Sequence, residues 1–312
     1  QKIHMKIALF GASSQIAKGL LREFLFEGIH QLYLFTRDVN TFQDWLNTNN
    51  FHDRNLSVDS LERFDTSVEF DLIINFIGIG DPAKALDMGS KIFDITFKHD
   101  HQVLDYLAIN SQTKYIFISS GVVYGNIFSN PATQTSDSVI SINALKHTDW
   151  YSMAKIYAEA RHRALDHLSI VDIRVFNYIS SDIDIDSRFL ISDALRAISE
   201  CKVMQTNKHN ITRDYIGPQD LHQLIQKLAN QDFLNISVDC FTKDPADKFS
   251  ILEIMKAEFD LQYEVIDANS GLDAHGLRDN YFSENYLASS FGYNPEFTSL
   301  ENIITASKDL LL

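Results

Sequence analysis

A tyrosine and a lysine four residues apart, Tyr151 and Lys155, form the pattern in this sequence with the clearest potential for chemistry. Side chains at positions i and i+4 lie on one face of a helix, so the two groups would be neighbours. An ammonium group close to a phenol lowers the pKa of that phenol, because positive charge stabilises the phenolate. The pair alone is weak evidence, since the same spacing also occurs on ordinary solvated helix faces.

Ser120 provides a hydroxyl that could complete such a site, because it ends an apolar run that precedes the tyrosine in the sequence. A serine hydroxyl next to the tyrosine would hold a substrate oxygen while the tyrosine gives or takes a proton. We therefore predict a proton-transfer site if the fold brings Ser120, Tyr151 and Lys155 together.

The elements that would position these residues follow a regular pattern as far as residue 180, where apolar runs alternate with segments of helical periodicity. The expected strands lie at residues 6–10, 32–35, 56–58, 71–78, 114–120 and 170–176. The expected helices lie at residues 16–25, 40–48 and 89–109 and around Tyr151. Residues 71–78 are almost continuously apolar, which is typical of a parallel strand buried on both faces. The alternation predicts an α/β fold with a Rossmann-type doubly wound parallel sheet.

The pattern weakens beyond residue 180, and residues 126–148 form a polar loop before the helix of Tyr151. Residues 234–239 read as a strand that rejoins the sheet. The remaining expected elements are helices around 188–200, 219–229, 249–258 and 299–311 and a strand at 261–266.

The turn after the first strand has the position of a phosphate-binding turn, because it opens a helix directly after a buried strand. Backbone N–H groups at such a helix N-terminus bind a pyrophosphate. The Gly-x-x-Gly-x-x-Gly spacing persists only as Gly11, Ser14 and Ala17, and an ordinary strand–helix turn is the alternative. The predicted cofactor-binding residues of this turn are Gly11, Ser13, Ser14, Gln15 and Ile16.

The second strand ends in Thr36-Arg37-Asp38, which bears on the choice of dinucleotide. An acidic residue at this place binds the ribose hydroxyls of NAD, whereas an arginine accommodates the 2′-phosphate of NADP. Because Arg37 comes first, we expect NADP(H) to be preferred, with NAD(H) possible through Asp38. The alternative is a surface Arg–Asp pair without a cofactor role.

Two domains are expected, because the regular alternation of strands and helices weakens beyond residue 180. Residues 5–180, together with about 213–243, would form the NAD(P)-binding Rossmann domain. Residues 181–212 and 244–312 would form a smaller mixed α/β substrate-binding domain. We expect residues 1–4, which precede Met5, to lie outside the fold.

Charge and cysteine content exclude several functional classes. The net charge is −15, from 27 basic and 42 acidic residues, and no Lys/Arg cluster offsets it, so we expect no nucleic-acid partner. The two cysteines, Cys201 and Cys240, exclude a disulfide framework and favour a reducing, cytoplasmic location. The longest apolar runs are strand-sized and the start of the chain lacks a signal-peptide pattern, so neither a membrane span nor secretion is expected.

Metal chemistry is not expected either. His147, His209 and His275 are scattered and show no metal-ligand spacing. We therefore predict no metal site.

Several segments, in order along most of the chain, carry a resemblance to a known family. They lie at residues 11–17, 71–78, 117–125, 151–155, 173–177, 212–216 and 287–295. Together they resemble the extended short-chain dehydrogenase/reductases, the NAD-dependent epimerase/dehydratase family that acts on nucleotide sugars. Ile77 is bulkier than the usual alanine, Thr96 stands where an asparagine is common, and Ser180 replaces a glycine.

The resemblance implies hydride transfer between the nicotinamide and a carbinol or ketone carbon of a sugar. Tyr151 would be the acid/base catalyst, Lys155 would lower its pKa and bind the nicotinamide ribose, and Ser120 would hydrogen-bond the reacting oxygen. Further cofactor contacts are implied for Phe76, Ile77, Gly78 and Ser119. The implied substrate contacts are Ser120, Val122, Asn177 and Arg213, with the arginine on the sugar-nucleotide diphosphate.

The reaction subtype is predicted from the residues that follow Ser120 and from the expected cofactor preference. Family dehydratases carry an Asp-Glu pair after the catalytic hydroxyl residue, and here Gly121-Val122 follow Ser120, so dehydration is disfavoured. Arg37 favours a reductase that exchanges NADPH, and we predict a nucleotide-sugar 4-ketoreductase. The alternatives are a 4-epimerase with tightly bound NAD and, in another class, a non-catalytic dinucleotide-binding sensor that interacts with a partner protein. The resemblance also suggests a homodimer.

Overall fold

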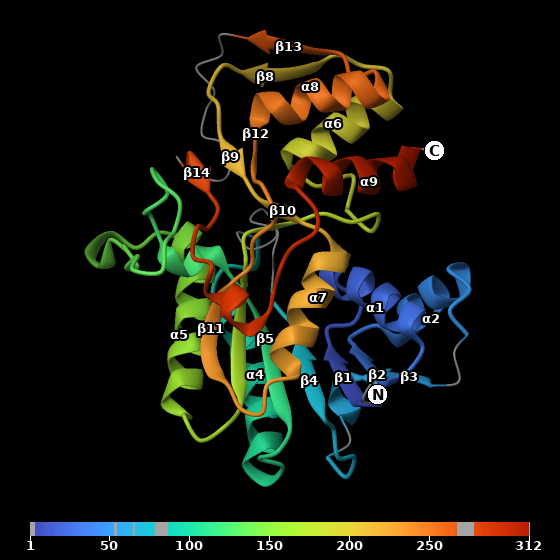
Figure 1. Ribbon diagram of the computed structural model, residues 1–312, viewed down its shortest axis with the longest axis vertical. Coiled ribbons are helices and arrows are strands. Elements are labelled where there is room, and N and C mark those ends of the chain that lie inside the picture. The colour runs from blue at the N-terminus through green and yellow to red at the C-terminus, as the bar shows by residue number, and fades with distance from the viewer. Residues whose placement is uncertain (1–3, 53–54, 65, 79–86, 267–277, 312) are drawn as a thin grey trace.

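The computed structural model describes the chain except for residues 1–3, 53–54, 65, 79–86, 267–277 and 312 (Figure 1). Within the described residues the central feature is a seven-stranded sheet in the order β11-β6-β5-β4-β1-β2-β3. Its strands are β1 (Lys6–Phe10), β2 (Gln31–Thr36), β3 (Leu56–Ser60), β4 (Leu72–Asn75), β5 (Lys114–Ser120), β6 (Ile170–Val175) and β11 (Asn235–Asp239). All neighbouring strands pair in parallel, so the predicted doubly wound sheet is confirmed.

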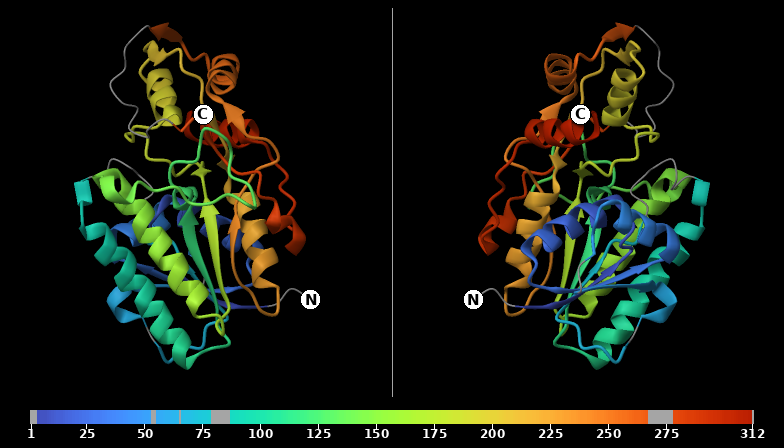
Figure 2. Two further views of the ribbon diagram at one scale, coloured as in Figure 1. Left: turned by 90° about the vertical axis from the view of Figure 1, so that its left-hand side faces the viewer. Right: turned by 90° about the vertical axis from the view of Figure 1, so that its right-hand side faces the viewer.

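Helices cover both faces of this sheet (Figure 2). One layer contains α1 (Gln15–Glu27), α2 (Val39–Thr48) and α7 (Pro218–Ala229), and the other contains α4 (Lys91–Ile109) and α5 (Trp150–Ala164). Successive side chains of β1 serve the two layers alternately, as strand geometry requires. Ile7 and Leu9 pack in the first core, whereas Ala8 and Phe10 pack in the second.

A smaller mixed α/β layer lies beyond the carboxyl ends of the strands (Figure 1). It contains α6 (Leu190–Ser199), α8 (Lys248–Phe259), α9 (Ser299–Leu311), β8 (Met204–Asn207) and β13 (Tyr263–Ile266). The helices share a hydrophobic core of their own, with Leu195, Met255 and Ile303 buried in it. These elements confirm the α/β fold class, while the domain limits drawn from the sequence stay a prediction.

Short strands join the two layers, and the sequence did not predict them. They are β7 (Asn177–Tyr178), β9 (Thr212–Arg213), β10 (Tyr215–Ile216), β12 (Ala246–Asp247) and β14 (Asn280–Tyr281). β9 pairs with both β12 and β14, and β10 pairs with β7. The segments around residues 177, 213 and 281 therefore meet above the sheet, although they are far apart in the sequence.

Two expected boundaries differ from the observed ones. The strand expected at 71–78 ends at Asn75, because the Asn75 side-chain oxygen accepts the Ile77 N–H at 2.8 Å and turns the chain out of the sheet. The loop 126–148 is not featureless: Gly125 bridges to Val139, and short 3-10 turns occur near its end. Among the described residues, none of the helices combines the length and apolar composition that a bilayer crossing requires.

Candidate active site

Tyr151 and Lys155 lie one turn apart on α5, on the side of the helix that packs against β5. Lys155 is buried, with 2% of its surface exposed. Its Nζ donates a hydrogen bond to the Ile118 carbonyl oxygen at 2.8 Å and lies 4.3 Å from the centre of the Phe117 ring. The same nitrogen is 5.8 Å from the centre of the Tyr151 ring. The helix therefore brings the pair together, and β5 fixes the lysine head.

Ser120 is the last residue of β5 and caps the short turn η2 (Gly121–Tyr124). Its hydroxyl oxygen accepts the Val122 N–H at 3.3 Å and lies 3.3 Å from the phenol oxygen of Tyr281. It also forms a hydrogen bond with the Tyr151 phenol. Three hydroxyl groups, from β5, α5 and β14, thus converge at one point.

The Tyr151 phenol is held in its protonated form. Burial raises its pKa, the neighbouring Tyr281 adds to the rise, and the hydrogen bond with Ser120 opposes it. For Lys155, burial lowers the pKa to about 8, although the carboxylates of Asp100, Glu159 and Asp172 oppose that shift. At neutral pH the site therefore contains a phenol that can donate a proton and a nearby ammonium group.

The turn between β1 and α1 has the geometry of an anion-binding helix terminus. Gly11 has a φ of +78°, and a side chain there would meet Ile77. The Ser14 hydroxyl caps α1 by accepting the Ala17 N–H at 3.2 Å. The Gln15 amide nitrogen is buried and has no hydrogen-bond partner among the described residues. An orphaned donor at a helix N-terminus fits a dinucleotide pyrophosphate, and Gly11, Ser14 and Gln15 would hold it.

The other predicted residues of this turn have different surroundings. The Ser13 hydroxyl accepts a hydrogen bond from the Thr36 hydroxyl at 3.0 Å, which ties the turn to β2. Ile16 is half-buried and packs against the core between the sheet and the layer of α1, α2 and α7. Both residues therefore shape the turn, and a contact with a dinucleotide stays a prediction for them.

The chain after β4 runs close to the lysine head. Phe76 is buried and Ile77 is half-buried. Gly78 has a φ of +154°, and a Cβ atom there would lie only 2.8 Å from the Lys155 Nζ. Ser119, which was also predicted to face the cofactor, donates its hydroxyl hydrogen to Glu159 at 2.6 Å. Gly78 thus leaves the space that the lysine occupies.

Arg37 and Asp38 differ in their surroundings at the end of β2. Asp38 caps α2, and its carboxylate accepts the Thr41 N–H at 3.0 Å and the Thr41 hydroxyl at 2.7 Å. These hydrogen bonds lower the pKa of Asp38. Arg37 is exposed. The carboxylate is therefore occupied by the helix cap, whereas the guanidinium lies at the surface.

The predicted substrate residues lie where the short strands meet. Asn177 begins β7, and its side-chain oxygen is buried without a partner among the described residues. Arg213 on β9 is 8% exposed and donates from one nitrogen to the carbonyl oxygens of Thr212 and Arg278. Val122 is buried in a cluster with Phe128 and Phe176.

Sequence reasoning missed two residues of this region, Arg278 and Tyr281. The Tyr281 ring packs edge-on against Phe128 at 4.7 Å, and the Arg278 guanidinium lies 5.2 Å from the Tyr281 ring centre. Neither residue belongs to a periodic segment, so no sequence pattern indicated them. The hydroxyl cluster therefore lies beside aromatic rings and the guanidinium groups of Arg213 and Arg278. Such a region suits a sugar ring attached to a diphosphate.

The chain is similar to known proteins, both to a family model and to solved structures. The model of the NAD dependent epimerase/dehydratase family matches residues 7–236. No match was found among the curated proteins.

Solved structures show the same fold over the full length. The UDP-N-acetylglucosamine 4-epimerase of Methanobrevibacter ruminantium M1, in complex with UDP-N-acetylmuramic acid, has a TM-score of 0.80 at 14% identity and covers 99% of this chain and 98% of its own. The UDP-glucose 4-epimerase of Bifidobacterium longum, in complex with NAD+ and UDP, has a TM-score of 0.77 at 15% identity, with 98% and 97% covered. The dTDP-glucose 4,6-dehydratase of Bacillus anthracis, in complex with NAD, has a TM-score of 0.78 at 14% identity, with 97% and 96% covered.

Proposed function

The chain belongs to the NAD-dependent epimerase/dehydratase family, and we propose that it is a nucleotide-sugar 4-ketoreductase. The observation that carries the proposal is the convergence of the Ser120, Tyr151 and Tyr281 hydroxyl groups at the end of β5, with Lys155 one helical turn from the tyrosine. Reduction of a ketone needs an acid at the carbonyl oxygen, and a phenol that is protonated at neutral pH can serve as one.

The residues of the chain then have defined tasks. The Ser120 hydroxyl donates a hydrogen bond to the sugar carbonyl oxygen, and Tyr151 gives the same oxygen its proton. Lys155 places positive charge beside the tyrosine and stabilises the phenolate that remains. Arg213 binds the diphosphate, and Asn177 offers the sugar its side-chain oxygen, which has no partner within the described part of the chain. The bound dinucleotide supplies the hydride.

NADP(H) is the proposed dinucleotide, with NAD(H) as the alternative. The support is that Asp38 is engaged in the α2 cap, whereas Arg37 is exposed beside it and suits a 2′-phosphate. The alternative has support of its own, because the structures of similar fold carry NAD. Arg37→Ala should weaken binding of NADPH far more than that of NADH, measured by the fluorescence of each dinucleotide. Equal weakening of both would remove the proposed preference.

A 4-epimerase is the second candidate, because several structures of the same fold are 4-epimerases. The two activities differ in the fate of the dinucleotide. A reductase consumes NADPH with each turnover, whereas an epimerase returns its hydride to the sugar and consumes none.

The experiment that separates the candidates uses the purified chain with NADPH and a panel of UDP-, dTDP- and CDP-linked sugars, including 4-keto-6-deoxyhexoses. Loss of absorbance at about 340 nm with a 4-keto sugar supports the reductase, and Tyr151→Phe should lower that rate by about 10²–10⁴-fold while it leaves NADPH binding intact. Interconversion of two sugars without loss of NADPH would establish the epimerase instead. Dinucleotide binding without any turnover would favour a sensor, and absence of dinucleotide binding would refute all three.

A homodimer through α4 and α5 is also proposed. Phe97 on α4 and Tyr157 on α5 are 42% and 53% exposed, and their rings lie 6.2 Å apart on the same face of the molecule. Exposed aromatic side chains on adjacent helices are typical of an interface. Sedimentation velocity should show a dimer that Phe97→Glu dissociates, and a monomeric wild-type chain would refute this interface.

A further inference from the structure

Lys155 is a buried cation that contacts no carboxylate among the residues that the structure describes. In the described part of the chain, its ammonium group has the Ile118 carbonyl oxygen and the Phe117 ring as partners, and it forms no ion pair. Burial of an ammonium group costs several kcal/mol unless opposite charge compensates it. A carbonyl dipole and a ring face supply part of that compensation, and the carboxylates of Asp100, Glu159 and Asp172 act on the ammonium from further away.

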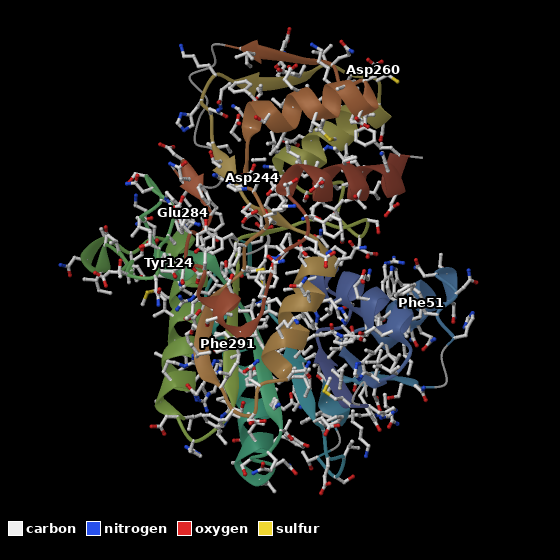
Figure 3. All side chains as sticks on the ribbon, in the orientation of Figure 1. Phe51, Tyr124, Asp244, Asp260, Glu284 and Phe291 are labelled. Atoms are coloured by element: carbon white, nitrogen blue, oxygen red, sulfur yellow. The ribbon has the colours of Figure 1, made fainter. Side chains whose placement is uncertain are left out.

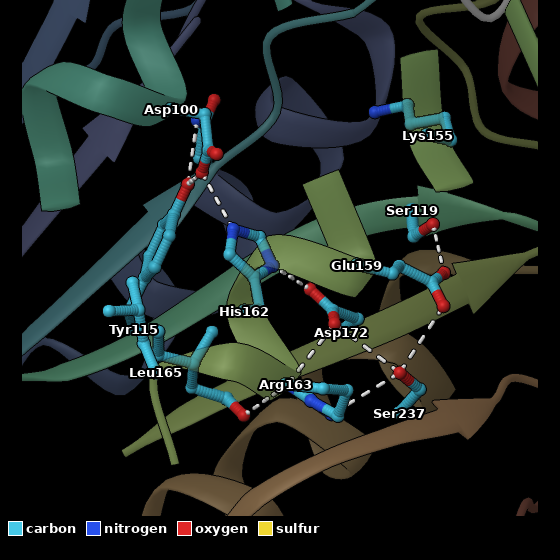
Figure 4. Close-up of polar contacts among 12 residues, drawn as sticks. Asp100, Tyr115, Ser119, Lys155, Glu159, His162, Arg163, Leu165, Asp172 and Ser237 are labelled. Carbon is cyan, nitrogen blue, oxygen red and sulfur yellow. Dashed lines mark hydrogen bonds and ion pairs between the residues drawn. The ribbon is translucent and has the colours of Figure 1, made fainter. Parts of the chain in front are cut away.

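A network of buried ionised groups begins two turns further along α5 (Figure 4). His162 has none of its surface exposed, and its two ring nitrogens contact Asp100 at 2.8 Å and Asp172 at 2.6 Å. Both nitrogens face carboxylate oxygens, so both must carry hydrogen, and the ring is an imidazolium. Burial alone would lower the pKa of His162, but Asp172 and Asp100 raise it to about 9.

The network continues from Asp172 toward Glu159. Asp172 pairs with Arg163 at 3.2 Å, and the Ser237 hydroxyl lies 3.3 Å from both Asp172 and Glu159. Glu159 forms a two-pronged ion pair with Arg174. Glu159 lies one turn from Lys155 on α5, so it connects this network to the helix that carries the lysine.

The network has an excess of negative charge. Arg174 also pairs with Asp239 at 3.4 Å, and Asp239 accepts a hydrogen bond from the Tyr124 phenol. Tyr124 lies at the end of the sheet nearest the smaller layer (Figure 3). The carboxylates are Asp100, Glu159, Asp172 and Asp239, and the cations are His162, Arg163 and Arg174. Four negative charges against three positive ones leave the network with one net negative charge.

We propose that this buried network, with the Asp100–His162–Asp172 cluster at its centre, is the counter-charge of Lys155 and keeps the lysine in its ammonium form. Asp100, His162 and Asp172 are then positioning residues that act on the reaction through Lys155. The catalytic importance of that lysine rests on the proposed function, but its charge does not. The titratable groups of the network and of its contacts are Asp100 on α4, Tyr115 on β5, Glu159, His162 and Arg163 on α5, Asp172 and Arg174 on β6, and Asp239 on β11. Among them, the carboxylates of Asp100, Glu159 and Asp172 raise the pKa of Lys155, and the Tyr151 ring lies 5.8 Å from its ammonium nitrogen.

The charge of His162 opposes that of the carboxylates, so variants with opposite charge changes should have opposite effects. His162→Gln removes one positive charge, so the negative field at Lys155 grows and its pKa should rise by about one unit. His162→Gln combined with Asp100→Asn removes one charge of each sign, so the pKa should return close to the wild-type value. A loss of packing alone would not reverse when a second substitution is added.

The test is an NMR titration of the whole chain labelled with ¹³C at lysine Cε, with the Lys155 signal identified by its loss in Lys155→Met. The readout is the pH at which that signal shifts, and it needs neither substrate nor turnover, so it is independent of the proposed function. Asp220→Asn is the matched control, because Asp220 is a buried carboxylate that accepts the N–H groups of Glu296 and Phe297 and takes no part in the network.

The proposal expects the upward shift in His162→Gln, its reversal in the double variant and no shift in Asp220→Asn. An unchanged midpoint in His162→Gln, or a double variant that stays shifted like the single one, would overturn it. If His162→Gln does not fold, the wild-type titration decides alone. A Lys155 signal that titrates below pH 7 would mean that the network fails to hold the ammonium.

Discussion

The Ser120 hydroxyl lies 3.3 Å from the phenol oxygen of Tyr281, and this contact joins the end of β5 to β14. Tyr281 is buried and belongs to the short strands that lie between the sheet and the smaller layer. A residue from the part of the sequence where the periodic pattern is weak therefore completes the hydroxyl cluster around Tyr151.

Tyr281→Phe should affect catalysis and leave dinucleotide binding unchanged. The phenylalanine ring keeps the packing against Phe128 and Phe176, whereas the hydrogen bond to Ser120 is lost. Loss of one hydrogen bond costs about 1 kcal/mol, so kcat/KM for the sugar should fall roughly 5-fold. Tyr263→Phe removes a phenol from the distant β13 and is the control. Equal effects of the two substitutions would show that Tyr281 has no role in the active site.

Gly78→Ala should displace the lysine head. A Cβ atom at residue 78 would lie 2.8 Å from the Lys155 Nζ, and the φ of +154° is one that alanine rarely adopts. The backbone strain alone costs on the order of 1–3 kcal/mol. We expect weaker dinucleotide binding and a loss of activity greater than the loss of stability would explain. Binding is measured by dinucleotide fluorescence, and stability by urea unfolding.

Gly89→Ala is the matched control for that substitution. Gly89 also has a positive φ, +53°, but a Cβ atom there has no neighbour within 4 Å among the described residues. The control should lose some stability and keep dinucleotide binding. If both variants bind the dinucleotide like the wild type, the close approach of Gly78 to Lys155 has no functional consequence.

Stability should fall with rising pH through the titration of His162. Its pKa is raised from 6.5 to about 9, so the folded chain holds this proton more tightly than the unfolded chain does. The resulting stabilisation is complete below pH 6.5 and is lost as the pH rises toward 9, with a loss on the order of 1–2 kcal/mol between pH 6.5 and 8. Lys155 has the opposite sign, because its pKa is lowered to about 8 and stability rises above that pH. Urea unfolding between pH 6.5 and 8 measures the first effect.

His162→Gln is the comparison for this pH dependence. The variant should be less stable at pH 6.5 and should show a flatter dependence up to pH 8, because its side chain does not titrate. A slope identical to that of the wild type would mean that other groups cause the pH dependence.

Much of the architecture was predictable because its signals are local. Continuous apolar runs mark β4 and β5, and helical periodicity marks α1, so the doubly wound sheet and the family resemblance were confirmed. Ser120 lies at a strand end and Tyr151 and Lys155 on one helix face, as expected, while their catalytic roles stay predictions.

The remaining features could not be predicted because they depend on contacts between distant segments. Strands of two residues, such as β9 and β14, are too short to show any periodicity. His162 gives no local signal, since its partners Asp100 and Asp172 lie on other elements, 62 and 10 positions away in the sequence. Polar residues inside an apolar layer are recognised only when the fold shows that they satisfy one another.

Glu159→Gln should destabilise the chain by more than the same change at an exposed ion pair. Glu159 meets Arg174 at 2.6 Å with 9% and 19% of the two side chains exposed, and it also accepts the Ser119 hydroxyl. The glutamine leaves a guanidinium largely buried with one fewer counter-charge, which should lower the free energy of unfolding by about 2–3 kcal/mol, somewhat less than for a fully buried pair. Glu200→Gln is the control, because Glu200 meets Lys202 at the same 2.6 Å but both side chains are exposed. Solvent screens that pair, so no measurable change is expected. Urea unfolding of both variants at pH 7 measures the difference, and equal losses would show that burial does not determine the strength of the Glu159–Arg174 pair.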